Sequence, residues 1–236
     1  MKERISFVFN EQPVETMAGR TLMDAAKELG VFIPGLCHCQ GLTPVGACRL
    51  CLVEVKNILR LLPACTTLVT EGMEVFTDSP KLREYRKMIL ELLFSERNHV
   101  CSFCVSNGHC ELQSLASELG VDHTRYAYRY PIHRVDASQS RFGFDPNRCV
   151  LCTRCVRVCE EIEGARTWGV KGRGIRSNVM TDLDRPWGES TSCTSCGKCV
   201  HACPTGALFE KGRATAEMKK RENILPYLTA MRAGGR

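Results

Sequence analysis

The chain has 236 residues, a formal net charge of +6 and 16 cysteines, a length that allows one large domain or about two to three small ones. Its first residues, "MKERISFVFNEQ", lack the apolar segment and cleavage site of a signal peptide. The longest apolar run, "MILELLF", is too short to cross a bilayer. We therefore expect a cytoplasmic protein without a transmembrane segment, peripheral to a membrane at most through partners. In that compartment, cysteines in C-x2-C spacing indicate metal binding rather than disulfides.

The positive charge suggests a nucleic-acid partner, but the formal count treats every cysteine as neutral. One [2Fe–2S] and three [4Fe–4S] clusters, oxidised and bound by thiolates and one histidine, would together carry about −7. The total charge would then fall from +6 to about −1. We therefore expect the basic side chains to balance iron–sulfur anions, and we expect no nucleic-acid partner.

The N-terminal part of the chain predicts a small α+β domain over residues 1–78. Residues 5–16 alternate apolar and polar side chains around a polar turn, which predicts a β-hairpin. Thr21 is a candidate N-cap for a helix over "LMDAAKEL", and Gly30 is placed to end that helix. A loop then leads to Cys37.

Four cysteines of this domain form the first predicted ligand group: Cys37, Cys48, Cys51 and Cys65. Plant-type ferredoxins space theirs C-x4-C-x2-C…C, so the longer first gap differs here. A hairpin that turns near Asn57 would return Cys65 beside Cys51. Four thiolates on a small α+β domain favour a [2Fe–2S] cluster, with a structural zinc ion as the alternative. Cys39 is left over and is predicted to be a buried free thiol.

The next segment predicts a small helical domain over residues 79–125. Pro80 suits the first helical position, with Ser79 as its N-cap. An apolar stripe at helical spacing predicts the face of this helix that packs into the core: Leu82, Tyr85, Ile89, Leu92 and Leu93. The stretch "CELQSLASELG" predicts a second, short helix that ends at Gly120.

Between these helices, "NHVCSFCVSNGHC" holds only three cysteines, Cys101, Cys104 and Cys110, flanked by two histidines. In extended chain, residues two apart point to the same side, so His99 and Cys101 would face one site. His109 adjoins Cys110 directly, and adjacent residues point apart. We predict that His99 completes a [4Fe–4S] site. In the alternative, both histidines lie at the surface and a group outside this motif is the fourth ligand.

The C-terminal half divides into a predicted linker (126–144), a cysteine-rich domain (145–210) and a charged tail (211–236). "CTSCGKCVHACPTG" fits the bacterial ferredoxin run C-x2-C-x2-C-x3-C-P, and "CVLCTRCVRVCE" repeats it with a glutamate in place of the proline. In such pairs of runs the fourth cysteine of each ligates the other cluster. Two [4Fe–4S] sites with crossed ligands follow: Cys149, Cys152, Cys155 and Cys203 for one, and Cys193, Cys196, Cys199 and Cys159 for the other.

The order of these groups resembles the N-terminal region of the large iron–sulfur subunit of respiratory complex I and the electron-input region of [FeFe]-hydrogenases. "GACRLCLVEV", "ELLFSERNHVCSFCVSNGHCELQ" and "NRCVLCTRCVRVCEEIEGA" look like the diaphorase small subunit, or U subunit, of bidirectional NAD-linked [NiFe]-hydrogenases. That resemblance implies that the first domain is a β-grasp domain. It also implies a partner subunit that carries FMN and NAD, together with small and large [NiFe]-hydrogenase subunits. Related proteins place the histidine ligand in H-x3-C spacing, where this chain has Arg97, a side chain with no free lone pair for iron.

The expected fold class is thus α+β: a β-grasp [2Fe–2S] ferredoxin domain, a small helical His/Cys3 cluster domain and a bacterial-ferredoxin-like domain for two [4Fe–4S] clusters. Only Cys39 remains for a nickel–iron site, and no G-x-G-x-x-G motif or catalytic triad stands out. We therefore predict an electron-transfer subunit without catalytic residues, which joins a diaphorase to a [NiFe]-hydrogenase (H2 + NAD+ = NADH + H+).

Two other functions remain as alternatives. One is the equivalent subunit of an NADH:quinone oxidoreductase or an NAD-linked formate dehydrogenase, relatives that usually carry a long molybdopterin-type domain after the clusters. The other, from a different class, is a zinc-binding nucleic-acid module, which the net charge and the C-x2-C pairs motivate. Iron and sulfide in the purified protein would separate a cluster protein from a zinc protein.

Overall fold

The computed structural model describes residues 4–220. Within them, one compact unit comprises residues 4–38 and 44–90, and a second comprises residues 39–43 and 91–220. The division falls inside helix α2 (Pro80–Glu96). The finer division into domains at 1–78, 79–125, 126–144, 145–210 and 211–236 stays a prediction.

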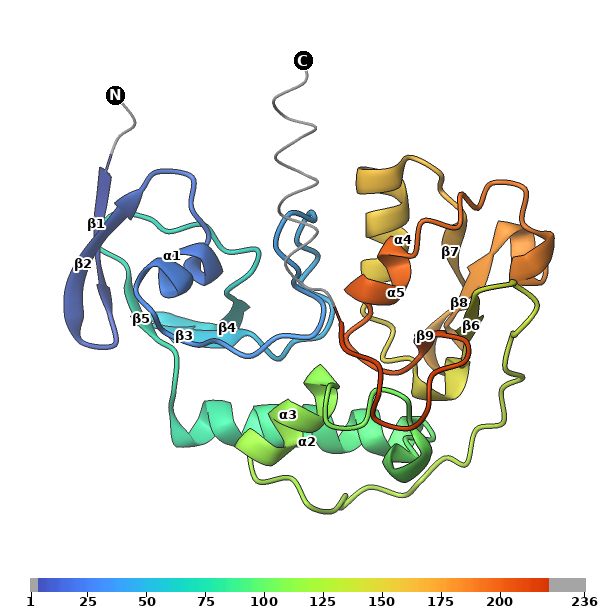
Figure 1. Ribbon diagram of the computed structural model, residues 1–236. Helices are drawn as coiled ribbons and strands as arrows, with labels where there is room; N and C mark the ends of the chain where they lie inside the picture. Colours follow the sequence, from blue (N-terminus) through green and yellow to red (C-terminus); the bar gives the residue numbers. More distant parts are fainter. Residues whose placement is uncertain (1–3, 221–236) are drawn as a thin grey trace. The chain divides into compact units, whose positions relative to one another are not determined.

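The first unit is built on one mixed sheet. Its strands are β1 (Arg4–Phe9), β2 (Gln12–Met17), β3 (Leu52–Val55), β4 (Ile58–Pro63) and β5 (Glu74–Phe76). They lie in the order β2-β1-β5-β3-β4, with β1 parallel to β5 and the other pairs antiparallel. Helix α1 (Leu22–Glu28) packs against this sheet (Figure 1). This strand order with one helix on the sheet is the β-grasp fold.

Local sequence signals account for the start of this unit. The β1–β2 hairpin turns at Asn10 and Glu11, both with positive φ, as tight hairpins with two-residue turns require. Thr21 and Asp24 form a reciprocal capping box at the start of α1. Gly30 follows the helix with a φ of 71°. The hairpin, the cap and the end of the helix are as the sequence predicts.

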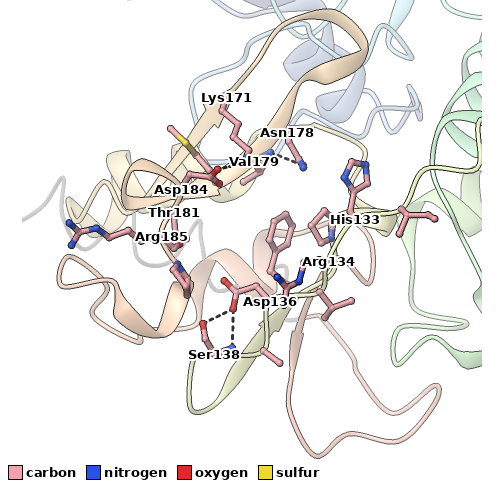
Figure 2. Close-up of a pocket in the computed structure, with 17 residues that line it drawn as sticks. His133, Arg134, Asp136, Ser138, Lys171, Asn178, Val179, Thr181, Asp184 and Arg185 are labelled. Atoms are coloured by element: carbon pink, nitrogen blue, oxygen red, sulfur yellow. Dashed lines mark hydrogen bonds and ion pairs between the residues drawn. The ribbon is translucent and has the colours of Figure 1, made fainter.

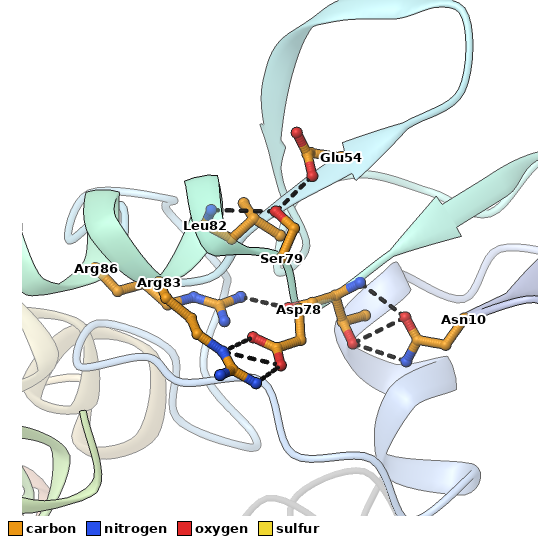
Figure 3. Close-up of polar contacts among 8 residues, drawn as sticks. Asn10, Glu54, Asp78, Ser79, Leu82, Arg83 and Arg86 are labelled. Atoms are coloured by element: carbon orange, nitrogen blue, oxygen red, sulfur yellow. Dashed lines mark hydrogen bonds and ion pairs between the residues drawn. The ribbon is translucent and has the colours of Figure 1, made fainter. Parts of the chain in front are cut away.

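Polar side chains fix the short connection between the end of β5 and the start of α2 (Figure 3). The Ser79 hydroxyl accepts a hydrogen bond from the Leu82 amide at 3.2 Å and donates one to the Glu54 carboxylate at 2.6 Å. The Thr77 amide donates to the Asn10 side chain at 2.8 Å. The predicted start of this helix, with Ser79 as its N-cap, is therefore confirmed.

The buried face of α2 differs from the predicted stripe. Leu82 and Leu90 are fully buried, whereas Tyr85 is 41% and Leu92 is 43% exposed. From Leu82 to Leu90 the buried positions are four residues apart, and the middle one is a charged residue, Arg86. A periodic pattern of apolar side chains does not identify a buried charged residue such as this one.

The second unit has shorter elements. They are a 3-10 turn at Cys101–Phe103, α3 (Glu111–Glu118), β6 (Phe142–Phe144), α4 (Arg154–Arg157), a π-helical turn at Val158–Glu163, β7 (Trp168–Lys171), β8 (Asn178–Thr181), α5 (Lys198–Ala202), β9 (Leu208–Glu210), and 3-10 turns at Pro146–Arg148, Gly174–Arg176, Asp182–Asp184 and Trp187–Glu189. Strand β6, at the end of the predicted linker, pairs antiparallel with β9. Strands β7 and β8 form a separate hairpin, and α4 and α5 lie side by side (Figure 1). The β6–β9 ribbon thus brackets both ferredoxin-type cysteine runs.

Aromatic rings fill the centre of the second unit. Trp168 and Trp187 meet edge to face, with ring centroids 4.8 Å apart. Phe142 stacks on Trp187 at 5.8 Å, and Phe144 meets Trp168 at 5.4 Å. All four side chains are buried, so they form a rigid apolar wall beside the cysteines.

The first ten residues of the predicted tail belong to the packed structure of the second unit. The amides of Ala216 and Met218 donate to the carbonyls of Cys104 and Val105 at 3.1 and 2.9 Å. Met218 is 2% exposed and lies in the core. Residues 221–236, the remainder of that tail, lie outside the described residues. Among residues 4–220, no helix combines the length and the apolar character that a membrane crossing requires.

Candidate metal centres

The four cysteines of the first group meet inside the β-grasp unit. Cys37, Cys51 and Cys65 are fully buried, and Cys48 is partly buried. The β3–β4 hairpin turns at Asn57, which has a φ of 65°, and returns the Cys65 sulfur to 3.4 Å from that of Cys51. The Cys48 amide lies 3.5 Å from the Cys37 sulfur. The hairpin predicted from the sequence therefore brings its two cysteines together.

Close contact between these thiols alters their acidity in opposite directions. Hydrogen bonds from Cys48 and Cys65 lower the pKa of Cys37, and a hydrogen bond from Cys65 lowers the pKa of Cys51. The same contacts raise the pKa of Cys48 and of Cys65. Four thiols this close share protons unless a cation replaces the protons. The group therefore has the donor set of a metal-thiolate site.

Arg86, the charged residue in the buried face of α2, supports this group. Its guanidinium donates to the carbonyls of Leu50 and Leu52 at 3.2 and 3.0 Å, and to that of Thr77 at 2.8 Å. Figure 3 shows the side chain reaching from α2 toward the end of β5. Leu50 and Leu52 flank Cys51, so Arg86 holds the backbone on both sides of that cysteine. In the sequence, the only sign of this role is that Arg86 stands four residues after Leu82, on the same face of the helix.

The second group lies in the other unit, between α2 and α3. Cys101 opens a 3-10 turn, Cys104 follows that turn, and Cys110 stands at the N-cap of α3. Cys104 and Cys110 are buried. Burial is the main cause of a raised pKa for Cys101 and raises the pKa of Cys110 to about 11. Thiolates at such positions need a nearby cation.

The two candidate histidines differ in their surroundings. His99 Nε2 is buried and has no hydrogen-bond partner, whereas His109 is exposed. Burial, with help from Arg148 and Arg97, lowers the pKa of His99 to about 4. The imidazole is therefore neutral near pH 7, with a nitrogen lone pair available to a metal. A buried nitrogen without a partner is costly unless a ligand satisfies it.

Arg97, two residues before His99, has partners of its own. Its side chain is buried, and its guanidinium contacts His133 Nε2 at 2.6 Å and the Ser177 carbonyl at 3.0 Å. These contacts tie the end of α2 to the 132–138 segment and to the start of β8.

Gly206 is a residue of the second group's environment that the sequence reasoning missed. A Cβ atom at this position would lie 2.3 Å from the Cys104 sulfur, a distance that real structures do not show. The glycine follows Cys203 and Pro204, so the end of the last cysteine run packs directly on a thiol of the His/Cys3 group. In the sequence, Gly206 is marked only by its place in the "PTG" that follows the final cysteine. The cysteine spacing does not show that this glycine contacts Cys104.

Replacing Gly206 with alanine should displace the Cys104 sulfur and remove about four iron atoms per chain. The added methyl overlaps the Cys104 sulfur, and the backbone of Cys104 is held by hydrogen bonds to the Cys101 carbonyl and from the Ala216 amide, so small shifts do not relieve the overlap. Iron analysis with low-temperature EPR measures the loss, and an intact [2Fe–2S] signal from the first unit shows that the chain has folded. Gly169→Ala is the matched control, because its methyl would meet only the flexible end of Met180 at 3.5 Å. Full iron content in Gly206→Ala would contradict the expected displacement.

The two ferredoxin-type runs repeat the same local backbone. In each run, the residues just before and just after the second cysteine have positive φ: Leu151 and Thr153 in the first, Ser195 and Gly197 in the second. A short helix carrying the third cysteine then begins, α4 or α5. Such alternation turns backbone amides inward to form a concavity for an anion. The Leu151 amide, for example, points to the Cys149 sulfur at 3.4 Å.

The cysteines of these runs line two cavities, one of which contains Cys149, Cys152, Cys155 and Cys203, and the other Cys159, Cys193, Cys196 and Cys199. Each cavity therefore contains three cysteines of one run and the fourth of the other. The exchange is made by the π-helical turn that carries Cys159 and by the turn after α5 that carries Cys203. Across residues 4–220, no three His, Cys, Asp or Glu side chains are arranged to hold a single metal ion.

All four thiols of the first cavity are buried, whereas in the second cavity Cys159 and Cys199 are buried, Cys193 is partly buried and Cys196 is exposed. Burial raises the pKa of Cys149 to about 11 and raises the pKa values of Cys152, Cys155 and Cys199 further. In the second cavity, two groups donate hydrogen bonds to sulfur. The Trp187 indole donates to Cys193 at 3.2 Å, and the Thr167 amide donates to Cys159 at 3.3 Å. Hydrogen bonds to sulfur raise the reduction potential of iron–sulfur clusters.

A more open groove in the second unit contains no cysteine (Figure 2). It lies between residues 132–138 and the β7–β8 hairpin, where Lys171 is ion-paired with Asp184. Asp136 accepts hydrogen bonds from the amides of Trp187 at 2.7 Å and Ser138 at 2.9 Å. The labelled carboxylates thus have structural partners, and Asp136 holds in place the tryptophan that donates to Cys193.

Three family models match the chain in the order of these groups. They are described as a 2Fe-2S iron-sulfur cluster binding domain (residues 2–80), an NADH-ubiquinone oxidoreductase-G iron-sulfur binding region (86–125) and an NADH-quinone oxidoreductase subunit 3 ferredoxin-like domain (142–209). The fold, the cysteine groups and these matches define an iron–sulfur protein with a [2Fe–2S] ferredoxin domain and 4Fe–4S ferredoxin-like regions.

The curated relatives of the chain are subunits of oxidoreductases. The chain is 38% identical over 209 residues to the G 2 subunit of the NADH-quinone oxidoreductase of Rhizobium meliloti, and 36% identical over 207 residues to the alpha subunit of the NADPH-Fe(3+) oxidoreductase of Geobacter sulfurreducens. These matches cover 87% and 88% of this chain but 24% of each relative, so the chain spans about a quarter of their length.

Two further relatives are matched over most of their own length. The gamma subunit of the NAD-reducing hydrogenase HoxS of Cupriavidus necator is 32% identical, with 88% of this chain and 87% of the relative covered. A chain from the crystal structure of an NAD+-reducing [NiFe]-hydrogenase in the H2-reduced state is 33% identical, with a TM-score of 0.85 and coverage of 95% and 96%. The chain belongs to the family of oxidoreductase iron–sulfur subunits that includes the HoxS gamma chain.

Proposed function

We propose that the chain is an electron-transfer subunit that carries electrons between a diaphorase subunit with FMN and NAD(H) and a [NiFe]-hydrogenase module with small and large subunits. The likeness to the chain of an NAD+-reducing [NiFe]-hydrogenase, with its TM-score of 0.85, carries this proposal. H2 supplies two electrons and two protons. NAD+ takes both electrons and one proton, and the other proton is released.

Four cluster sites supply the path for electrons. The proposed ligands are Cys37, Cys48, Cys51 and Cys65 for one [2Fe–2S] cluster; His99, Cys101, Cys104 and Cys110 for a [4Fe–4S] cluster; Cys149, Cys152, Cys155 and Cys203 for another; and Cys193, Cys196, Cys199 and Cys159 for the last. The thiol contacts in the first unit, the unsatisfied His99 nitrogen and the two cysteine-lined cavities support these sets. When bound, the clusters accept and donate one electron at a time. The chain's own residues hold them, shield them from water and set their charge.

A second candidate is the equivalent subunit of an NADH:quinone oxidoreductase, which the 38% identity to the NADH-quinone oxidoreductase chain of Rhizobium meliloti favours. A formate dehydrogenase subunit is a related candidate, since a putative formate dehydrogenase of Staphylococcus aureus is 28% identical. Both candidates keep the role in electron transfer and differ in the partner chains.

Anaerobic purification of the tagged chain with its partners tests the proposal. We expect brown protein with about 14 iron atoms per chain, together with a flavin subunit and two hydrogenase subunits identified by mass spectrometry. The complex should reduce NAD+ with H2, and the isolated chain should not. Colourless protein that contains zinc would contradict the cluster assignment. Copurification with quinone-reductase or formate dehydrogenase subunits instead would favour the second candidate.

A further inference from the structure

A buried lysine lies among the proposed [4Fe–4S] sites of the second unit. The Lys220 ammonium donates to the Val200 carbonyl in α5 and to the Leu208 carbonyl in β9, both at 2.9 Å. Lys220 as a whole residue is half-buried, and its ammonium lies against the carbonyls of two residues that are fully buried. The segment that carries it is anchored by Met218, which is 2% exposed.

Burying this ammonium requires compensation. A buried cation is costly unless a negative charge lies nearby, and backbone carbonyls alone do not supply a full charge. Arg154, another buried cation of this unit, is paired with the Glu111 carboxylate at 2.5 Å. For Lys220, no carboxylate is paired with the ammonium anywhere in residues 4–220. Among residues 4–220, another kind of group therefore has to supply its compensating charge.

The contacts of this segment lie beside cysteines. The Val200 carbonyl that accepts from the ammonium belongs to the residue directly after Cys199, and the Met218 amide donates to the carbonyl of Val105, directly after Cys104. Burial lowers the pKa of Lys220, and the groups that oppose this effect are the thiols of Cys203, Cys110, Cys104 and Cys199, in decreasing order. These four cysteines belong to all three proposed [4Fe–4S] ligand sets. Anionic clusters bound by these cysteines would supply the negative charge that no carboxylate of residues 4–220 provides to the ammonium.

We infer that the Lys220 ammonium is a fixed positive charge that raises the reduction potential of at least one neighbouring [4Fe–4S] cluster. This inference rests on the cluster ligands of the proposed function. One-electron reduction adds a negative charge to a cluster, and a fixed positive charge in a low-dielectric interior stabilises the reduced form more than the oxidised form. Lys220 thus acts on electron transfer from outside the ligand set.

The test separates the charge of Lys220 from its hydrogen bonds. Lys220→Gln keeps a donor for the two carbonyls but removes the charge, and Lys220→Arg keeps both. Lys219→Gln removes one charge from the exposed neighbouring position and serves as the matched control. Each variant is purified anaerobically as the full chain with its partners and titrated with dithionite, while EPR follows each cluster and iron analysis follows its content.

We expect Lys220→Gln to retain its iron and to shift at least one [4Fe–4S] midpoint potential to a more negative value. Lys220→Arg should stay close to the wild type, and Lys219→Gln should not differ from it. Unchanged midpoints in Lys220→Gln, or equal shifts in the Gln and Arg variants, would overturn the inference. Iron lost from Lys220→Gln but kept in Lys220→Arg would also overturn it, because the charge would then retain a cluster rather than set its potential. A wild-type chain without clusters would instead refute the proposed function itself.

Discussion

Replacing His99 with alanine should remove one [4Fe–4S] cluster, or about four iron atoms per chain, while the other clusters remain. The His99 Nε2 atom is buried without a hydrogen-bond partner, and burial lowers the pKa of its imidazole to about 4. A neutral imidazole nitrogen without a hydrogen-bond partner can bind iron as the fourth ligand, beside the three cysteines. Alanine leaves only three thiolates, and the cluster becomes labile.

His99→Cys distinguishes a ligand from a residue that merely packs at the site. A thiolate in place of neutral imidazole adds one negative charge to the cluster, so reduction becomes harder. We expect this variant to keep the [4Fe–4S] cluster at a more negative midpoint potential, measured by EPR-monitored titration.

His109→Ala is the control for both His99 variants, because His109 is exposed in the same segment. Its iron content and spectra should match the wild type. A cluster lost from His109→Ala and retained in His99→Ala would reverse the assignment of the ligand.

Replacing Cys51 with serine should lower H2-dependent NAD+ reduction by roughly tenfold or more in the assembled complex. Cys51 is fully buried, its sulfur lies 3.4 Å from that of Cys65, and Arg86 holds the carbonyls on both sides of it. A serine hydroxyl is a poor iron ligand at neutral pH, so the [2Fe–2S] cluster should be lost or altered. The artificial-dye activities of the flavin and hydrogenase subunits should persist, because the proposed function places their substrate sites on other chains.

Cys39→Ser is the matched control for Cys51→Ser. Cys39 lies two residues from Cys37 but belongs to the second unit, where it packs against the core. The Cys39→Ser variant should keep all four clusters and the turnover of the wild type. Full H2-to-NAD+ turnover in Cys51→Ser with its [2Fe–2S] signal gone would refute the role of that cluster in the path. Loss of about two iron atoms from Cys39→Ser would show that Cys39 is a ligand.

Features governed by neighbouring residues were readable from the sequence. The β1–β2 hairpin, the Thr21 cap, the turn at Asn57 and the N-cap at Ser79 all depend on contacts within a few residues. The regular C-x2-C spacing likewise predicts the cysteine groups, because three ligands on one short loop are close in any compact conformation. Local chemistry is therefore enough to predict these elements and the residue types at each site.

Other features depend on residues far apart in the sequence, and only the tertiary structure decided them. Pairing of β6 with β9 was hidden in a segment that the sequence presents as a linker. Arg86 occupies a buried position of α2, where an apolar side chain would be expected, because its guanidinium donates to three backbone carbonyls there. Gly206 meets Cys104, and Lys220 meets α5 and β9, across separations that no local pattern records. Spacing thus determined which residues are suited to bind metal, whereas long-range packing decided what surrounds them, because burial and charge at a site are properties of the whole fold.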